Sequence, residues 1–408
     1  MIKKEGCKMD DAKGLLEGIV ILDLTRVLAG PYCCALLADM GATVIKIENP
    51  KGGDDSRHMG PFINDNSVYY ANFNRSKYGC TINFKAPEGK EMFKEMVKQA
   101  DVVIENYRPG TMEKLGLGYD DVLSKINPSL IYGAVSGFGQ TGPYSRRAGY
   151  DIIGQAMGGM MSTTGWPGGE PTRVGTPIGD VLGGLNLCIG VLAALVNRVK
   201  TGKGEKVDVA LVDSVAAAME NITMIYQATG RIPQRIGNRY ESTYPYDSFP
   251  AKDGNVIIGT ANNKLYDILC DVMGKPELKT DPKFKDVKDR VANHVEMRKI
   301  VSDWTSQYTI DEVVETLNKA GVPSCQVNTL DRLVKEPQVA GDRKMFPEMD
   351  QPGIGKLNIT AAPQHFTRTK ACIRKAAPLL GEDNAAIFKK FLGYDAAKLA
   401  ELKDKGII

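Results

Sequence analysis

One carboxylate, that of Asp180, stands alone in a stretch of small and apolar residues. Gly179 precedes it, no other acid occurs in residues 174–190, and apolar side chains then recur at helical spacing with small residues between them. Two interpretations are open. Asp is favoured at the N-terminal cap of a helix, where its carboxylate accepts backbone N–H bonds. Alternatively, Asp180 is a carboxylate nucleophile or acid that is reached through a glycine-lined opening. The two are compatible, and the local sequence does not separate them.

Other side chains that commonly carry chemistry are scarce or dispersed. The chain has three histidines, His58, His294 and His365, and none is paired in sequence with another candidate metal ligand. Its eight cysteines contain no CxxC spacing, which gives little support for a zinc site or a redox dithiol. We therefore expect no metal, and we expect reduced, mostly buried thiols. Carboxylates, backbone amides and the bound substrate are the groups left for catalysis.

Short apolar runs indicate the elements that must position these groups. Runs at residues 18–24, 41–48, 101–105, 129–135 and 204–210 are typical of buried parallel strands. A further strand is expected at residues 81–84, and one long helix at residues 212–228. Glycine-rich polar loops at residues 106–116 and 136–143 follow two consecutive strands, at the end where ligands of open α/β sheets bind. The turn after the first strand lacks GxGxxG, which disfavours a dinucleotide site. The sequence thus predicts an α/β fold with a Rossmann-like parallel sheet.

Length and composition bound the organisation of the chain. With 408 residues it exceeds one ordinary core, so two domains are expected. After Gly230 the pattern changes to antiparallel strands at residues 246–249 and 255–259 followed by helices, which predicts a smaller α+β domain at 230–330. A net charge of +3 without a dense basic block disfavours nucleic acid as a partner. The apolar stretches are too interrupted for a membrane span, and the N-terminus lacks the apolar core of a signal peptide. We expect a cytoplasmic protein.

Many short motifs occur in one order along nearly the whole chain. They include residues 16–24, 29–31, 41–48, 101–106, 114–116, 136–139, 201–204, 321–323 and 377–381, together with Gly53-Asp54, Arg57, Tyr150-Asp151 and Gly179-Asp180. In these motifs the chain resembles the class III CoA-transferases, the family of formyl-CoA transferase and carnitine CoA-transferase. Residues 53–57, 108–116 and 234–239 are most similar to acetyl-CoA:oxalate-type members.

The resemblance implies a fold, an activity and a mechanism. Family members move CoA from an acyl-CoA donor to a free carboxylic acid without a metal. The residue that matches their nucleophile is Asp180, which would attack the thioester, form a mixed anhydride and become an aspartyl-CoA thioester. The family fold is an interlocked homodimer in which each chain forms a ring. It implies a large CoA-binding domain at 1–229, the small domain at 230–330, and a tail at 331–408 that returns to the large domain.

The resemblance also implies contact residues by position. Those matching CoA contacts are Val27, Leu28, Ala29, Arg57, Lys85, Asn106, Tyr107, Arg108, Lys114, Leu115, Tyr150 and Asp151. Those expected to contact the acid are Tyr150, Gly259, Asn262, Asn263 and Lys264. From the residues alone, the charged ones could equally be solvated surface groups.

Two departures bear on the substrate. Leu28 and Asn49 stand where formyl-CoA:oxalate enzymes carry Gln and Arg, which argues against formyl-CoA as the donor. We therefore expect oxalate or another small dicarboxylate as the acceptor. A carnitine- or hydroxy-acid-type transferase is an alternative. An acyl-CoA racemase of the same broad fold would need a histidine beside the acid, and only His58 lies near the motif region. A non-catalytic CoA-binding subunit is the remaining alternative.

Overall fold

The computed structural model describes residues 14–408, and it divides the chain into two compact units. Within the described residues, unit 1 comprises 14–160, Arg173–Met224 and Pro337–Ile408, and unit 2 comprises Met161–Thr172 and Ile225–Glu336. The expected domain boundaries lay at 229/230 and 330/331, whereas the units change at 224/225 and 336/337, and a short segment after Met160 also belongs to unit 2. The N-terminal residues on which the signal-peptide prediction rests lie outside the described part.

A six-stranded parallel sheet organises unit 1. Its order is β5-β2-β1-β6-β7-β8, with β1 at Val20–Asp23, β2 at Thr43–Glu48, β5 at Lys77–Thr81, β6 at Val102–Glu105, β7 at Ile131–Ser136 and β8 at Lys206–Ala210. The α/β prediction is confirmed. The chain builds outward from β1 in one direction and then from β6 in the other, so a crevice is expected where these two strands end.

One strand prediction was displaced. The strand expected at residues 81–84 lies instead at Lys77–Thr81. The start of β5 was missed because its first residue is a lysine, which is unexpected in a buried strand. The Lys77 ammonium is fully buried here and pairs with Asp23 at 2.9 Å. A buried charge that has found its partner is tolerated, and the sequence does not reveal that partner.

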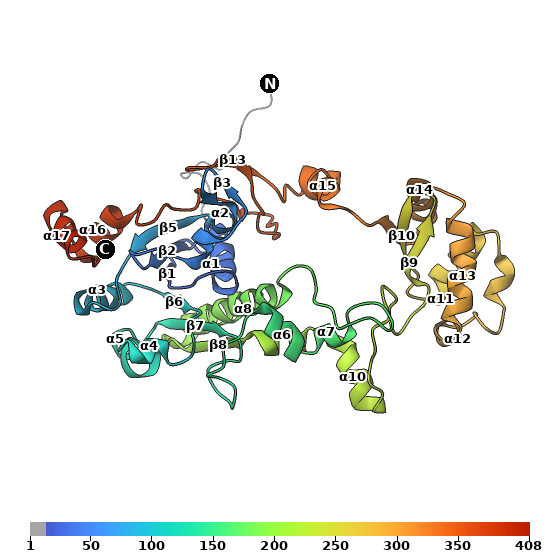
Figure 1. Cartoon of the computed structure of the whole chain (residues 1–408), viewed down its shortest axis with the longest axis horizontal. Helices are drawn as coiled ribbons and strands as arrows, with labels where there is room; N and C mark the ends of the chain where they lie inside the picture. The colour runs from blue at the N-terminus through green and yellow to red at the C-terminus, as the bar shows by residue number, and fades with distance from the viewer. Residues whose placement is uncertain (1–13) are drawn as a thin grey trace, which may run out of the picture. The chain divides into compact units, whose positions relative to one another are not determined.

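Helices cover the two faces of the sheet, as Figure 1 shows. On one face α1 (Ala29–Asp39) and α8 (Ile178–Thr201) pack against Ile21, Val102 and Val135. On the other face α3 (Pro87–Val97) meets the C-terminal helices α16 (Asn384–Leu392) and α17 (Ala396–Asp404) over Leu22 and Val103. Ile21 and Leu22 thus serve opposite cores, as alternation along a strand requires.

Helix α8 approaches α1 closely through a glycine. A side chain at Gly184 would place its Cβ 2.5 Å from the Ala29 carbonyl oxygen, so only glycine permits this contact. By length and composition α8 is also the one helix within residues 14–408 that could cross a membrane. Core helices pass the same test, and one face of α8 is buried against α1 and the sheet. Its other face exposes Ile189, Val196 and Val199.

Shorter elements complete unit 1. They are β3 (Phe62–Ile63), β4 (Asn66–Ser67), α2 (Val68–Asn74), α4 (Thr111–Lys114), α5 (Ser124–Ile126), α6 (Asp151–Met157), α7 (Met160–Thr163), α9 (Leu211–Ala217), α10 (Glu220–Thr229), β12 (Glu348–Gln351) and β13 (Gly355–Asn358), with α7 and α10 crossing into unit 2. The single helix expected at 212–228 was wrong. The chain breaks between α9, which ends at Ala217, and α10, whose first residue, Glu220, has a φ of 50° that a continuous right-handed helix would not adopt.

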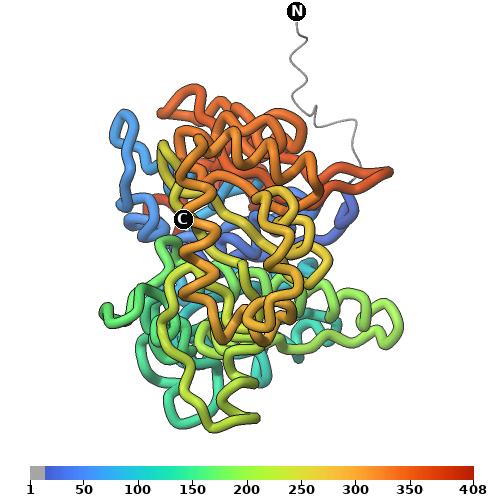
Figure 2. Tube along the Cα trace, turned by 90° about the vertical axis from the view of Figure 1, so that its right-hand side faces the viewer, coloured from blue at the N-terminus to red at the C-terminus, as the bar shows by residue number. Residues whose placement is uncertain are grey.

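Unit 2 is an α+β unit with its own core. Its antiparallel sheet has the order β11-β10-β9, formed by Ser324–Gln326, Gly254–Gly259 and Tyr246–Ala251. The helices are α11 (Asn263–Val272), α12 (Val287–Ala292), α13 (His294–Thr305), α14 (Ile310–Ala320) and α15 (Leu330–Leu333). Phe249, Tyr266, Phe284 and Met297 fill the core. The longer segment of this unit, Ile225–Glu336, runs from yellow-green to orange in Figure 2.

Candidate active site

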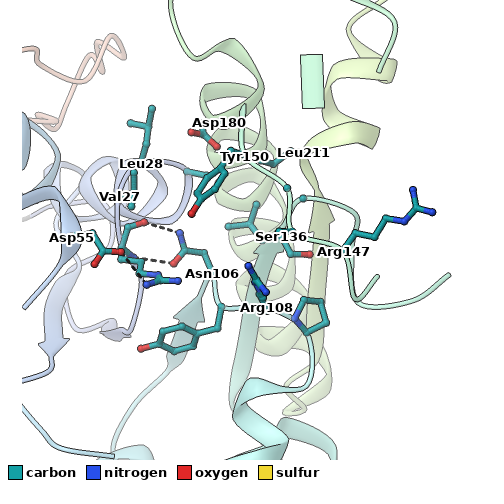
Figure 3. A pocket seen from close by; sticks show the side chains of 18 of the residues that line it. Val27, Leu28, Asp55, Asn106, Arg108, Ser136, Arg147, Tyr150, Asp180 and Leu211 are labelled. Carbon is teal, nitrogen blue, oxygen red and sulfur yellow. Dashed lines mark hydrogen bonds and ion pairs between the residues drawn. The ribbon is translucent and has the colours of Figure 1, made fainter. Parts of the chain in front are cut away.

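A cavity of ≈ 290 Å³ opens in unit 1 where β1, β6 and β7 end. It is the crevice that the strand order predicts, at the point between β1 and β6 where the direction of strand addition reverses. The loop after each strand contributes to its wall: residues 26–29 after β1, residues 106–109 after β6, and Ser136 with Gly137 after β7. Asp180 and Tyr150 complete the wall from α8 and the start of α6 (Figure 3). Loops far apart in the sequence therefore meet around one carboxylate.

The turn after β1 is held from two directions. The Asn106 side chain accepts a hydrogen bond from the Arg26 N–H at 2.9 Å and donates to the Arg26 carbonyl at 2.7 Å, and both bonds are drawn in Figure 3. The Val27 N–H donates to Asp54 Oδ1 at 3.0 Å. Helix α1 begins two residues later, at Ala29, after an N-cap, Leu28, whose side chain accepts no hydrogen bond. Within residues 14–408 the N–H groups of Leu28 and Ala29 meet no protein acceptor, as is usual at a helix start.

Asp180 is not the cap of its helix. It is the third residue of α8, whose N-cap is Pro177. The capping carboxylate comes from Asp151, whose Oδ1 accepts the Gly179 N–H at 2.8 Å while its Oδ2 accepts from Gln155 at 2.8 Å. The two interpretations of Asp180 are thereby separated. Since Asp151 caps the helix, the Asp180 carboxylate is left to line the cavity.

Burial makes Asp180 a weak acid. Desolvation, followed by the negative charge of Asp151, raises the pKa of its carboxyl to about 7. The N-terminus of α8 favours the anion, but burial and the neighbouring carboxylate outweigh this effect. The charge of Asp180 also reaches Tyr69 on α2, since burial and then that charge raise the pKa of the Tyr69 hydroxyl to about 12. The sequence reasoning did not identify Tyr69, which had no motif to mark it.

A second buried carboxyl shapes the loop after β6. Glu105 Oε2 accepts the Tyr107 N–H at 2.6 Å, and Oε1 accepts from the Tyr132 hydroxyl at 3.2 Å. Burial raises the pKa of Glu105 to about 7, against the lowering effect of these two donors. Glu105 therefore fixes the backbone of a loop that lines the cavity. This role cannot be read from the sequence, where Glu105 looks like the polar end of a strand.

The structure brings most of the expected CoA contacts into the cavity wall. Those that line it are Val27, Leu28, Ala29, Asn106, Tyr107, Arg108 and Tyr150. Both amide groups of Asn106 are hydrogen-bonded to the Arg26 backbone. Asn106 therefore positions the turn, and these groups are not available to a ligand. Tyr150 is 72% exposed and Arg108 is also exposed, so both are available to a bound molecule.

The remaining expected CoA contacts lie elsewhere in unit 1. Arg57 donates from Nε and Nη2 to Glu48 at 2.9 and 2.7 Å and stacks 3.8 Å above the Tyr70 ring. Its guanidinium therefore ties the loop to β2 and does not line the cavity. Asp151 lies behind the wall as the cap of α8. Lys85 and Lys114 are exposed outside the cavity wall, and Leu115 is partly buried beside Lys114.

The expected acid contacts other than Tyr150 belong to unit 2, and the side chains of two of them are hydrogen-bonded within that unit. Asn262 caps α11 by accepting the Leu265 N–H at 3.0 Å. Asn263 accepts a hydrogen bond at 2.8 Å from Arg290, whose side chain is fully buried. Gly259 ends β10, and Lys264 is exposed in the first turn of α11.

The wall also contains residues that the sequence analysis did not name individually as contacts, although Pro109, Ser136 and Gly137 belong to the two loops expected at this edge. The full set is Arg26, Asp55, Met59, Pro109, Val135, Ser136, Gly137, Arg147, Ala148, Gly149 and Leu211. Arg26 is neutralised by Asp55 at 3.0 Å, whereas Arg147 stacks 3.7 Å above the Tyr144 ring. In residues 14–408 neither Arg147 nor Arg108 is in an ion pair. The same part of the chain holds no group of three or more His, Cys, Asp or Glu side chains arranged for a metal.

Comparison with known proteins finds one family throughout. The family model described as CoA-transferase family III matches residues 16–384. The chain is 40% identical to acetyl-CoA:oxalate CoA-transferase of Acetobacter aceti, over 94% of this chain and 97% of that protein. It is 37% identical to succinyl-CoA:glutarate CoA-transferase of Homo sapiens, covering 96% and 90% of the two chains. Among solved structures, a CAIB/BAIF family protein from Brucella suis superposes with a TM-score of 0.80 at 36% identity, over 93% of this chain and 100% of that one.

Proposed function

Because this chain belongs to CoA-transferase family III and is a class III CoA-transferase, we propose that it transfers CoA through a covalent intermediate on Asp180 and that its acceptor is a small dicarboxylic acid. The observation that carries the proposal is the Asp180 carboxylate, which is relieved of capping by Asp151 and lines the cavity at the switch point of the sheet. The CoA thioester and the free acid are both substrates, and the enzyme is left unchanged.

The chemistry needs no external base or redox partner. An Asp180 oxygen attacks the thioester carbonyl, the C–S bond breaks, and CoA leaves as the thiolate, which gives a mixed anhydride. The thiolate then attacks the Asp180 carbonyl carbon and expels the donor acid as its carboxylate, which leaves an aspartyl-CoA thioester. The acceptor carboxylate repeats both steps in reverse order, releasing the new acyl-CoA and the Asp180 carboxylate. Dividing one exchange into such steps is what a covalent nucleophile contributes.

The environment of Asp180 supports this role. A carboxylate that burial has made more basic is also a better nucleophile once it has lost its proton, and its pKa of about 7 leaves a substantial ionised fraction at neutral pH. Each attack creates an oxyanion, which needs fixed donors. The free N–H groups of Leu28 and Ala29, at the positive end of α1, are the donors we assign to it.

The acceptor class rests on the relatives and on the charges at the cavity. The names of the relatives pair CoA with oxalate, glutarate, D-citramalate and mesaconate, all of them dicarboxylic acids. Arg108 and Arg147 lie in the wall without a carboxylate partner in the described chain. We assign them to the anionic groups of the substrates, the CoA phosphates and the second carboxylate. The racemase alternative lacks its histidine here, since His58 does not line the cavity and lies 3.1 Å from the Gly52 carbonyl.

We further propose that the enzyme works as a homodimer. The face of α8 turned away from the sheet exposes Ile189, Val196 and Val199 to 63%, 61% and 88%. Apolar surface of this kind is costly to leave in water and is typical of interfaces. The assignment is checked by measuring the molar mass in solution.

Trapping of the intermediate tests the mechanism. The enzyme is incubated with an acyl-CoA and then with hydroxylamine, and peptides are mapped by mass spectrometry; the label is expected on Asp180. Asp180→Ala should abolish transfer, whereas Asp213→Ala should not, because Asp213 is the corresponding third residue of α9 but is exposed. Full transfer by the Asp180 variant refutes the nucleophile. A panel of mono- and dicarboxylic acids with one donor then tests the acceptor class, which fails if monocarboxylic acids are preferred.

A further inference from the structure

The turn that carries the assigned oxyanion donors is held in a costly conformation. Val27 has a φ of 65°, and of the six non-glycine residues with positive φ in residues 14–408 it alone is β-branched. A β-branched side chain is a genuine outlier in this region, because its Cβ substituents crowd the backbone. Such strain persists only where the surroundings over-determine it, and it gathers at functional sites. Val27 lines the cavity, so the question is what holds it.

The Asp54 carboxylate provides that hold. Its Oδ1 accepts the Val27 N–H at 3.0 Å and also the N–H and Oγ–H of Ser56, both at 2.8 Å. Its Oδ2 pairs with Lys46 Nζ at 2.8 Å, and the two side chains are 1% and 0% exposed. Lys46 in turn donates to the Thr25 carbonyl at 2.8 Å. One buried ion pair therefore fixes the turn at Thr25 and again at Val27.

The loop that carries Asp54 is itself fixed to the sheet. Glu48, at the end of β2, accepts the Asp54 N–H at 2.8 Å. Gly53 before it has a φ of 69°, and a side chain there would place its Cβ 2.8 Å from Glu48 Oε1. Although burial acts to raise it, the Lys46 ammonium holds the pKa of the Asp54 carboxyl well below its ordinary value. The acceptor for Val27 is thus permanently ionised and cannot move far.

We propose that Asp54, with Lys46 as its buried counter-ion, is a positioning residue that keeps Val27 left-handed and thereby aims the first N–H groups of α1 at the reacting carbonyl. The inference rests on the proposed function, because it needs an oxyanion beside Asp180. Helix α1 cannot compensate by moving as a body, since its Ala29 carbonyl is packed against Gly184 of α8. If Val27 relaxed to a negative φ, the peptide planes that follow it would turn and their N–H groups would lose their aim.

The test compares two buried ion pairs that differ in one respect. Asp54→Ala/Lys46→Met removes the pair that holds the turn. Asp39→Ala/Arg75→Met removes the pair at the other end of α1, where Arg75 Nη2 lies 2.7 Å from Asp39 and the side chains are 1% and 0% exposed. Each change replaces a whole pair, because a lone buried charge would destabilise the protein strongly. Val27→Gly is then added to each, since glycine adopts positive φ without a Cβ clash.

Transfer kinetics should separate the two pairs. We expect kcat to fall about 10- to 100-fold without the Asp54 pair and by less than about threefold without the Asp39 pair, given the usual cost of such strain. Adding Val27→Gly should recover at least several-fold of the loss in the first background and nothing in the second. Asp54→Asn/Lys46→Met, which keeps an acceptor, should retain more kcat than Asp54→Ala/Lys46→Met. An equal loss in both pairs, or no recovery by glycine, overturns the proposal.

Hydrogen exchange gives a readout that does not depend on the nucleophile. Amides in the peptide covering residues 25–29 should exchange faster when the Asp54 pair is removed and at the parental rate when the Asp39 pair is removed. Unchanged exchange refutes the positioning role even if Asp180 proves to be the nucleophile, and an active Asp180→Ala enzyme would leave the exchange result standing. If the Asp54 variants do not fold, Val27→Pro, which fixes a negative φ and removes the N–H, is compared with Val27→Gly and must lose far more transfer; a proline variant as active as the glycine variant overturns the proposal.

Discussion

Replacing Asp180 by Asn should make the protein more stable while abolishing transfer. In the folded chain Asp180 loses its proton near pH 7, whereas in the unfolded chain it does so near the ordinary value of 3.8. Between these values the folded state binds more protons, so stability falls as the pH rises from about 4 to about 7. The interval corresponds to about 4 kcal/mol. Because a neutral amide does not carry this cost, Asp180→Asn should gain up to about 4 kcal/mol of unfolding free energy at pH 8.

The pH dependence of the gain is the decisive measurement. Denaturant titrations of the parental protein and of Asp180→Asn are compared at pH 8 and at pH 5. At pH 5 the parental carboxyl is protonated in the folded state, so the advantage of the amide should be less than half as large. Asp213→Asn serves as the control and should show little gain at either pH, because that side chain is exposed. A gain that is the same at both pH values, or a loss of stability at pH 8, would refute the reasoning that burial makes ionised Asp180 costly.

Three other substitutions test separate parts of the site. Asp151→Asn removes a charge that raises the pKa of Asp180, so the rise of kcat/KM near pH 7 should move to lower pH by up to about one unit; an unmoved profile would mean that burial alone sets that pKa. Arg57→Leu leaves the buried Glu48 carboxylate without its cation, which should cost about 3–5 kcal/mol of unfolding free energy while the Kd for CoA stays within about twofold; a large loss of CoA affinity in the folded variant would contradict our placement of Arg57. Asn106→Ala frees the turn after β1 and should lower kcat about tenfold, judged from two lost hydrogen bonds; steady-state kinetics with unchanged kcat would mean that the turn is held without it.

Much of the fold followed from local patterns. A strand buried on both faces is mostly apolar, which is why β1, β2, β6 and β7 stand out in the sequence, although β2 also contains the buried Lys46. Glycine-rich polar loops after consecutive strands also indicated the edge at which the cavity lies. The apolar pattern did not predict the start of β5, where Lys77 is buried in an ion pair. Its partner, Asp23, is far away in the sequence, so the sequence gives no sign that this lysine can be buried.

Site residues can likewise be engaged by partners that the sequence does not show. Charge and family position made Arg57 look like a CoA contact, yet its guanidinium donates two hydrogen bonds to Glu48, nine residues away, and others to Tyr70 and Pro378. Asn106 was expected to bind CoA, and it lines the cavity, but its amide groups are occupied by backbone. A sequence states what a side chain can bind. It does not state which of several possible partners the fold brings into contact with that side chain.

Asp180 illustrates the division between sequence and tertiary structure. The sequence by itself determined that an acid stands before an apolar helix, in a chain short of histidine, and the order of its motifs identified the family. It left open whether the acid caps the helix or faces a ligand, because both outcomes use the same residue at the same place. Tertiary structure excluded the cap by bringing Asp151 to the Gly179 N–H. Because a carboxylate from another segment accepts that N–H, the Asp180 carboxylate is not used there and lines the cavity.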